Sequence, residues 1–363
     1  MTLHLRKKAL ETIRTFFEMH PGFKVVGVFA CGALGGLIFI KLALPLPWLL
    51  GSMTACTLAC LAGAPFEGPN KLRTIVLPVL GVMLGSNFNS TVLSEIHLWL
   101  GTLGILCGFI SILTIIGALA LRISGVGNPA TCFFSALPGG FSEMVLLLDD
   151  CHVNRRTVSL IHATRILITI LVIPLWFQIF TEYQVPMSPV KEALATISIK
   201  DSLILIACAI LGYVIAKKLR IPAAALLGPA LISAIVHILD LTAARPPNEL
   251  LAIAQLVIGI IAGCRFSGVT AKEFFSSILA GLFLAISMII SAALLSYLLA
   301  NTTGLSQEAL WLAFAPGGLT EMTLMSLAMN VDVALVSIHH TVRIFFIVTI
   351  IPFAFKITKK YLA

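Results

Sequence analysis

Two short stretches of this chain combine a helix-breaking motif with a carboxylate, and each lies inside an apolar run. The first reads ALPGGFSEM at residues 136–144 and the second AFAPGGLTEM at residues 313–322. Proline lacks an amide hydrogen and clashes with the preceding turn, while glycine loses the most backbone entropy, so each Pro-Gly-Gly must interrupt its helix. Inside a membrane, broken backbone persists only where protein or water satisfies its freed polar groups, a construction that transporters use for ion and substrate sites.

A carboxylate follows each break, Glu143 in the first copy and Glu321 in the second. Near the N-terminus of a restarting helix a carboxylate is stabilised, which predicts Ser142 or Thr320 as N-cap and each Glu in a first turn. Because intramembrane carboxylates are costly and commonly functional, a second interpretation has each Glu also facing a polar cavity, where it binds a coupling cation or a proton.

One arginine interrupts the last apolar run of each half, Arg165 in the first and Arg343 in the second. Each lies nine to eleven residues beyond the preceding charge, about 14–17 Å of helix, and therefore near the middle of the membrane. An unpaired arginine there is costly, so each must have a partner. One hypothesis is a structural ion pair between Arg165 and Glu143 or Glu321. The other is an anion pocket formed by both guanidinium groups beside the helix N-termini at the breaks.

A histidine precedes each arginine by three residues, which places His162 and His340 on the same helix face as their arginines. Each is a hydrogen-bonded packing residue or a proton relay. The spacing lacks a His-x-x-x-His or Glu-x-x-His pair, so we expect no metal site and no cofactor. The predicted substrate- or ion-binding residues are Gly139, Gly140, Ser142, Glu143, His162, Arg165, Gly317, Gly318, Thr320, Glu321, His340 and Arg343.

The composition places these residues in a membrane. Apolar residues make up 59% of the 363 residues and charged residues 11%, against about 45–50% and 25% in soluble domains. The chain is therefore predicted to be an all-α polytopic membrane protein with the lipid bilayer as its surroundings. The net charge of +8 comes from residues scattered between apolar runs, which argues against a nucleic-acid partner. The eight cysteines lie mostly in apolar runs and are interpreted as small helix residues.

The chain is built from two tandem homologous halves. Residues that recur at an offset of 177 are Cys31, Lys41, Pro45 and Gly51, and those that recur at 178 are Gly81, Gly85, Phe88, Glu95, Pro138, Glu143, Arg165 and Pro174. The glycine pairs predict close helix packing. We expect a cytoplasmic interfacial segment at 1–24, a first membrane repeat at 25–180, a connecting loop at 181–201, a second repeat at 202–356 and a cytoplasmic tail at 357–363.

The orientation of the halves depends on whether each Pro-Gly-Gly segment crosses the membrane. A segment that dips in and returns gives five crossings per half and inverted repeats, whereas a crossing segment gives six and parallel repeats. With the two intramembrane arginines left out, the first topology places 18 Lys and Arg inside and 4 outside, and the second places 14 and 8. Segment lengths fit both topologies, but the positive-inside rule favours inverted repeats with one re-entrant hairpin each and both termini in the cytoplasm.

The duplicated Pro-Gly-Gly-x-[Ser/Thr]-Glu-Met signature resembles that of the bacterial membrane AbrB family, over essentially the whole chain. Members of that family are described as ammonia monooxygenases or as regulators of gene expression. Five helices and one Gly-Gly re-entrant loop per half also resemble sodium/glutamate and 2-hydroxycarboxylate symporters in architecture alone, which does not fix a substrate. The resemblances imply the bacterial plasma (inner) membrane and suggest a homodimer.

Three functions fit this sequence to different degrees. The best supported is a secondary transporter that moves a small organic anion by alternating access, with Na+ or H+ as candidate coupling ion, and therefore no enzyme. The alternative is a membrane-embedded regulator of gene expression that acts through a ligand or a partner. A monooxygenase is disfavoured because His162 and His340, each three residues before an arginine, have a spacing that is poor for metal ligands.

Overall fold

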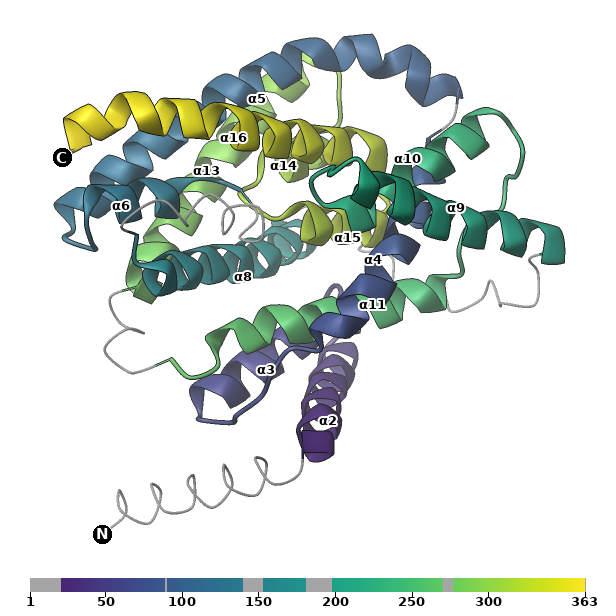
Figure 1. The fold of residues 1–363 in the computed structure, drawn as a ribbon, viewed down its shortest axis with the longest axis horizontal. Coiled ribbons are helices and arrows are strands. Elements are labelled where there is room, and N and C mark those ends of the chain that lie inside the picture. Colours follow the sequence, from purple (N-terminus) through teal and green to yellow (C-terminus); the bar gives the residue numbers. More distant parts are fainter. Residues whose placement is uncertain (1–20, 89, 140–152, 181–197, 270–276, 363) are drawn as a thin grey trace.

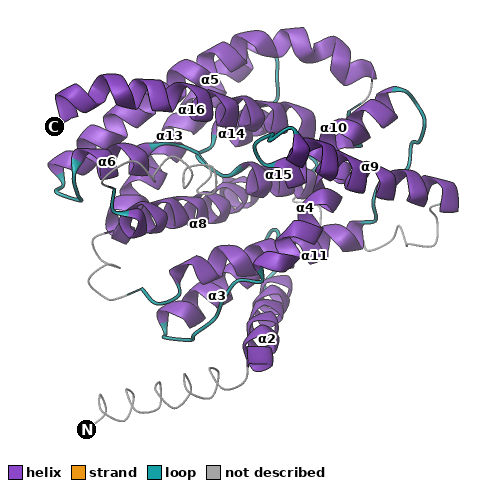
Figure 2. Cartoon of the chain, viewed as in Figure 1, coloured by secondary structure: helices purple, strands orange, loops and turns teal. Residues whose placement is uncertain are grey.

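The computed structural model describes residues 21–88, 90–139, 153–180, 198–269 and 277–362, and its regular secondary structure there is entirely helical (Figure 2). The all-α prediction is confirmed. Within these ranges seven helices are long and apolar enough to cross a membrane, namely Lys24–Lys41, His97–Ile123, Arg155–Ile179, Ile199–Lys218, Asn248–Phe266, Leu279–Thr303 and Val333–Ile350.

The helices follow the same order in both halves (Figure 1). The first half contains α2 (Pro21–Lys41), the π-helical η1 (Pro47–Gly51), α3 (Ser52–Leu61), α4 (Asn70–Gly85), α5 (Ser90–Ile123), α6 (Pro129–Ala136) and α8 (Arg155–Phe180). The second half contains α9 (Ile199–Lys218), α10 (Ala224–Ile238), α11 (Asn248–Gly263), the 3₁₀-helical η3 (Cys264–Phe266), α13 (Leu279–Thr303), α14 (Gln307–Phe314), α15 (Leu319–Met329) and α16 (Val333–Leu362).

The element boundaries repeat at the offsets found in the sequence. Helices α4 and α11 start and end 178 residues apart, and so do α6 and α14. Left-handed backbone at Ala43 and Leu46 recurs 177 residues later, at Arg220 and Ala223. Because non-glycine residues rarely adopt this conformation, its recurrence reflects equivalent local geometry in the two halves.

The predicted segment ends differ from the helix ends by a few residues. Helix α2 starts at Pro21, a residue whose fixed φ suits a first helical turn, so Lys24 lies within the helix. The predicted interfacial segment otherwise falls at residues 1–20, outside the described part of the chain. At the other end α16 continues through most of the predicted tail, to Leu362.

Helices of opposite halves pack closely at four glycines. Helix α4 packs against α10, and α11 packs against α3 and η1. A Cβ added to Gly81 would overlap the Leu226 carbonyl, and one added to Gly263 would lie 2.6 Å from the Met53 carbonyl. Gly85 and Gly259 are equally crowded. The prediction of close packing at the Gly-x3-Gly pairs is confirmed, and the contacts join one half to the other.

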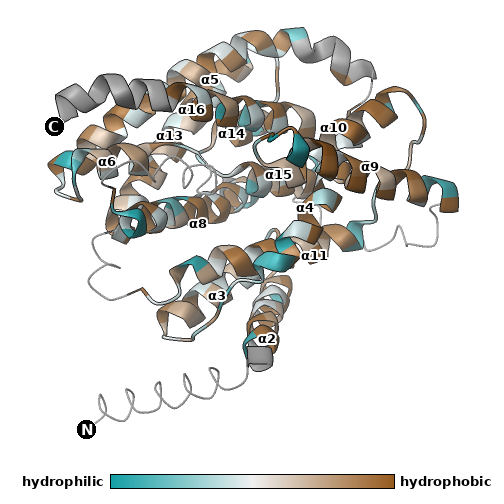
Figure 3. Cartoon of the chain, in the orientation of Figure 1, coloured by the Kyte–Doolittle hydropathy of each residue, from teal (hydrophilic) through white to brown (hydrophobic). Residues whose placement is uncertain are grey.

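Burial separates central from peripheral helices. About two thirds of the apolar stretches of α8 and α11 is buried, compared with 22% for α2, α5 and α9. The peripheral helices are apolar along much of their length (Figure 3), and they carry exposed hydrophobic side chains such as Leu34, Ile116 and Ile206, as expected of helices that contact lipid. Helix α15 contacts α4, α8, α11 and α16 and is almost wholly buried, so the second Pro-Gly-Gly segment lies at the centre of the molecule.

Candidate substrate site at the two helix breaks

The second break is a short extended link between two half-helices. Helix α14 ends at Phe314, and α15 starts at Leu319 with Gly318 as its N-cap. A Cβ on Gly317 would lie 2.5 Å from Met322 Cε, and a Cβ on Gly318 would overlap the Glu321 carboxylate. Each glycine of the motif therefore makes room for one later residue of the same motif, the first for Met and the second for Glu.

The predicted N-cap at Thr320 is wrong. Thr320 lies in the first turn of α15, and the N-cap is Gly318, which has no side chain to accept a backbone hydrogen bond. The Glu321 carboxylate occupies the space beside this residue, which explains why a capping side chain is absent. Glu321 itself is in the first turn, as predicted. The equivalent Gly140, Ser142 and Glu143 lie outside the described residues.

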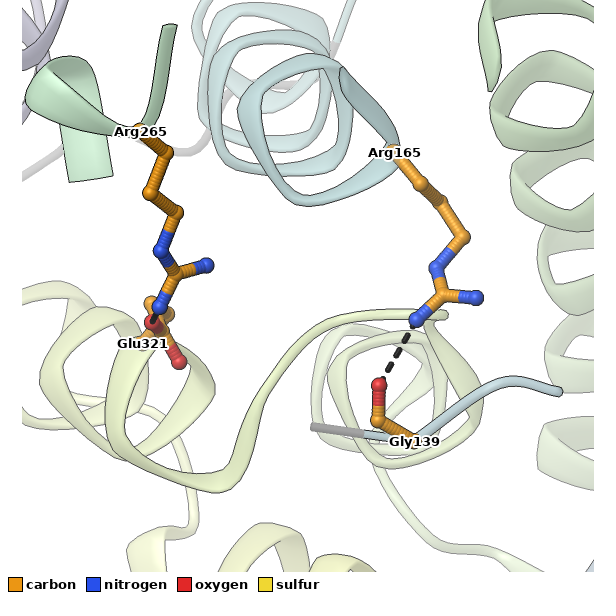
Figure 4. Close-up of polar contacts among 4 residues, drawn as sticks. All are labelled: Gly139, Arg165, Arg265 and Glu321. Carbon is orange, nitrogen blue, oxygen red and sulfur yellow. Dashed lines mark hydrogen bonds and ion pairs between the residues drawn. The ribbon is translucent and has the colours of Figure 1, made fainter. Parts of the chain in front are cut away.

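Glu321 pairs with Arg265, which is not among the predicted site residues. Its side chain is buried, and its Oε1 lies 3.8 Å from Nη2 of Arg265, in η3 directly after α11 (Figure 4). The predicted pairing of Arg165 with Glu321 is therefore wrong, because the Arg165 guanidinium is engaged by backbone carbonyls elsewhere. Pairing of Arg165 with Glu143 falls outside the described residues.

Arg165 donates hydrogen bonds to carbonyls of both breaks. Its side chain is fully buried, with Nη1 2.6 Å from the Leu137 carbonyl and Nη2 2.8 Å from the Gly139 carbonyl, both in the first break. Its Nε donates to the Pro316 carbonyl, 3.0 Å away in the second break. Carbonyls at the end of an interrupted helix lack the backbone N–H donors of a continuous helix. The Arg165 guanidinium supplies donors to such carbonyls in both breaks.

Arg343 donates hydrogen bonds to carbonyls of its own half. Its Nη1 donates to the Ala315 carbonyl at 2.6 Å and its Nη2 to the Ala313 carbonyl at 2.8 Å. Its Nε is buried and finds no hydrogen-bond acceptor in the described part of the chain. The two arginines are therefore unequal, although they hold equivalent sequence positions. Each guanidinium is directed at carbonyls, whereas an anion pocket would leave several of these donors open.

The two histidines orient the two arginines. His162 Nε2 lies 2.9 Å from the Phe134 carbonyl, and His340 Nε2 lies 2.9 Å from the Leu312 carbonyl. A carbonyl can only accept, so each Nε2 must carry the proton, and each Nδ1 is left to accept from its arginine, at 3.1 Å for Arg165 and 3.4 Å for Arg343. Both rings are buried and act as hydrogen-bonded packing residues in this arrangement.

The structure brings together most of the predicted residues that it describes, and it adds Arg265. Gly139, His162 and Arg165 meet the Pro316-Gly317-Gly318 link, and Glu321 opens the helix that follows. Arg265 was missed because its repeat counterpart is Asn87, so it lacked the pairing that marked the other residues. Within the described ranges, no group of three or more His, Cys, Asp or Glu side chains is arranged to hold a metal ion.

Seven membrane-length apolar helices, together with the interrupted segment of α14 and α15, are those of a multi-pass helical membrane protein. The chain belongs to the AbrB family, because the family model described as "Transition state regulatory protein AbrB" matches residues 48–359.

Two relatives match over most of their length. "Uncharacterized protein YhjN" of Bacillus subtilis (strain 168) is 27% identical over 352 residues, which cover 89% of this chain and 90% of the relative. "Putative regulator AbrB" of Escherichia coli (strain K12) is 25% identical over 336 residues, 89% of this chain and 93% of the relative. No solved structure matches the chain.

Proposed function

We propose that this protein is a secondary transporter that moves a small organic anion by alternating access. The proposal rests on the hydrogen bonds of Arg165. This residue donates to the Leu137 and Gly139 carbonyls at the first break and to the Pro316 carbonyl at the second. Interrupted helices that meet near the middle of the membrane are the construction in which transporters place substrate and coupling ions. The proposal involves transport alone and no chemical reaction on the substrate.

Contacts near the helix ends support segments that dip into the membrane and return. The backbone N–H of Asn154, just before α8, donates to Thr131 Oγ1 at 3.1 Å, near the start of α6. The first Pro-Gly-Gly lies between these two residues in the chain, so the two ends of the segment lie side by side. Gln178 Nε2 donates to the Ala43 carbonyl at 2.8 Å. The C-terminal end of α2 and the C-terminal end of α8 therefore lie at the same membrane face, which is possible only if the first Pro-Gly-Gly segment does not cross the membrane.

The second segment enters near the other end of α8. Trp311 of α14 packs edge-on against Phe177, with ring centroids 5.0 Å apart. Phe177 lies 22 residues beyond the start of α8, about 33 Å of helix at 1.5 Å per residue. Since α6 begins beside the start of α8 and α14 begins near its end, the two hairpins approach from opposite faces. This arrangement favours inverted repeats.

The charge distribution supports the same topology. Arg265 is an ion-pair partner of a buried carboxylate and carries no topological information. Without it the re-entrant topology places 17 Lys and Arg inside and 4 outside, and the crossing topology places 14 and 7. Asn87 and Arg245 also line one cavity, and they share a face only in the re-entrant topology. The positive-inside rule then places both termini in the cytoplasm.

Glu321 and Arg265 form the site where the substrate anion and the coupling ion bind. Their 3.8 Å separation is longer than the ~2.7–2.9 Å of a charge-assisted hydrogen bond. A substrate carboxylate that enters between them takes Arg265 as its partner, and Glu321 is then neutralised by Na+ or H+. This exchange couples anion to cation, since a buried carboxylate without a partner is costly.

The unequal arginines provide the alternating element. Arg165 Nε binds the Pro316 carbonyl, and the equivalent acceptor for Arg343 Nε, 178 residues earlier, is the Pro138 carbonyl. In the opposite-facing state the bond from Arg343 Nε to the Pro138 carbonyl forms, and the bond from Arg165 Nε to the Pro316 carbonyl is released.

The proposed surroundings and partners follow from the same function. The protein lies in the lipid bilayer of the bacterial inner membrane, acts as a homodimer and binds no nucleic acid.

The test is uptake of ¹⁴C-labelled lactate, succinate, citrate and glutamate into proteoliposomes under Na+ and H+ gradients. We expect saturable uptake of one acid class, lost in Arg265→Gln and retained in Arg122→Gln, a matched change at an exposed arginine. No uptake above empty liposomes by folded protein under either gradient would overturn the proposal.

A regulator of gene expression is the second candidate, because the family description and the name of the Escherichia coli relative both point to regulation. The two functions separate in cells that carry Arg265→Gln. A transcriptional effect that persists without transport favours the regulator, whereas loss of both indicates that the effect follows from the transported metabolite.

A further inference from the structure

Four cysteines from three separate elements lie in one packed cluster, three of them buried and Cys31 partly buried. Cys31 lies on α2, Cys56 and Cys60 lie one turn apart on α3, and Cys264 starts η3. Cys56, Cys60 and Cys264 belong to one cluster of buried residues, Cys31 packs against that cluster, and α3 contacts η3. Cysteines on two elements in contact are candidates for a disulfide, whose Cα atoms lie about 4.4–6.8 Å apart.

The backbones around the cluster are also in contact. A Cβ added to Gly263, the residue before Cys264, would lie 2.8 Å from the Cys56 Cβ. Three of the cysteines belong to one hydrophobic cluster, together with Phe66, Ile260 and Phe266. The cysteines are therefore held near one another by helix packing that is independent of any bond between them.

Packing alone does not require thiols here. The repeat-equivalent positions of Cys56, Cys60 and Cys264 are Ser233, His237 and Ser86. Those three residues fill the same space in the other half, where Ser233 Oγ donates to the Val82 carbonyl at 3.0 Å. Because serine and histidine side chains fill the equivalent site in the other half, packing alone does not explain why three cysteines are present at this site.

We propose that Cys60 and Cys264 are a thiol oxidation site, which forms a disulfide between the two halves of the protein when exposed to a peroxide. Cys60 is the penultimate residue of α3, and Cys264 directly follows α11, so both lie at helix ends. Both retain slight exposure, 4% and 8%, whereas Cys56 is fully covered. Either thiol can react first with the same overall balance, and attack by Cys60 is one of the two equivalent routes.

The reaction balances with hydrogen peroxide as the oxidant. The Cys60 thiolate attacks one peroxide oxygen, the O–O bond breaks, and Cys60 becomes a sulfenic acid while one water forms. The Cys264 sulfur then attacks the Cys60 sulfur and displaces the sulfenic oxygen as a second water. In total two S–H bonds and one O–O bond break, one S–S bond and two O–H bonds form, and two electrons pass from sulfur to oxygen.

The disulfide would act on the neighbouring ion pair. Cys264 precedes Arg265, whose guanidinium lies 3.8 Å from Glu321. A covalent bond from η3 to α3 fixes the backbone that carries Arg265. Cytosolic disulfides are commonly transient and redox-sensing, and this one would tether the two halves reversibly. Its formation is independent of whether the protein transports an anion.

The experiment uses full-length protein in membrane vesicles, with a protease site inserted in the 181–197 connection and all cysteines except Cys60 and Cys264 replaced by alanine. After hydrogen peroxide and cleavage, the halves should migrate together on non-reducing gels and separate after reduction. We expect at least about tenfold more linked product than in a matched variant that retains Cys60 and Cys208, because only the first pair is held together. Cys208 is equally buried but belongs to another cluster.

Wild-type protein provides the second measurement, in case the cysteine replacements disturb folding. Peroxide treatment should remove two hydrogens from its mass and yield a peptide pair that contains residues 60 and 264. Two outcomes overturn the proposal: no linked product while both thiols react with maleimide after denaturation, or a link that forms through Cys56 in the variant retaining Cys56 and Cys264 and not through Cys60.

Discussion

Replacement of Arg165 by glutamine should destabilise the protein more than the same change at Arg343. Arg165 donates three hydrogen bonds to buried carbonyls, two in its own half and one to Pro316. Arg343 donates two, to Ala315 and Ala313. A hydrogen bond to a charged group contributes about 1.5–3 kcal/mol, and a buried acceptor left unsatisfied costs a similar amount.

These values predict a loss of about 5 kcal/mol or more in the free energy of unfolding for Arg165→Gln and about 3 kcal/mol for Arg343→Gln. The difference of at least about 1.5 kcal/mol measures the single bond that joins the two breaks. The exposed Arg122→Gln should change stability by less than about 0.5 kcal/mol.

The assay is unfolding of micelle-solubilised protein by a denaturing detergent, followed by tryptophan fluorescence. Trp311 packs against Trp176 and Phe177 on α8, eleven and twelve residues from Arg165, so two of the four tryptophans report loss of this region. An equal loss of unfolding free energy in the two variants, or a larger loss in Arg343→Gln, would contradict the prediction that Arg165 contributes more to stability.

Three further predictions concern the packing and the ion pair. Gly317→Ala should lower the unfolding free energy by about 1–3 kcal/mol because its Cβ meets Met322, and the added Met322→Ala change should restore part of that loss; no rescue in the double variant would contradict the packing. Gly263→Val should impair assembly of α11 on α3, measured by folded yield and melting temperature, whereas Gly101→Val should be tolerated because its Cβ points into open space; equal effects would contradict the contact. The charge exchange Arg265→Glu with Glu321→Arg should recover more thermal stability than either single variant retains, and additive losses would show that the two residues are not coupled.

The helices and both breaks were predictable because their signals are local. Proline and paired glycines end a helix wherever they occur, and a duplicated motif at 138 and 316 marks the breaks twice. The boundaries of α6 and α14, which flank these motifs, follow the repeat offset to the residue. The inverted orientation of the halves stays a prediction, supported by the contacts at the helix ends.

The partners of the buried charges were less predictable because they depend on tertiary contacts. The rule that a buried arginine needs a partner holds for Arg165, but the partners are carbonyls of the breaks, which a count of carboxylates does not reveal. Arg265 directly follows an apolar run in the sequence, and only the tertiary structure places it beside Glu321. Comparison of the halves shows Arg265 opposite Asn87, and this asymmetry is the signal that could have identified it.

The most direct test of the central claim is the sidedness of the two hairpin entrances, Asn128 before α6 and Ser306 before α14. Single cysteines at these positions, in a protein that lacks the native eight, are labelled in intact cells and in inverted vesicles with an impermeant maleimide. Segments that dip in from opposite faces to meet at Arg165 predict labelling of residue 306 only in intact cells and of residue 128 only in inverted vesicles. Labelling of both positions from the same face would contradict the account.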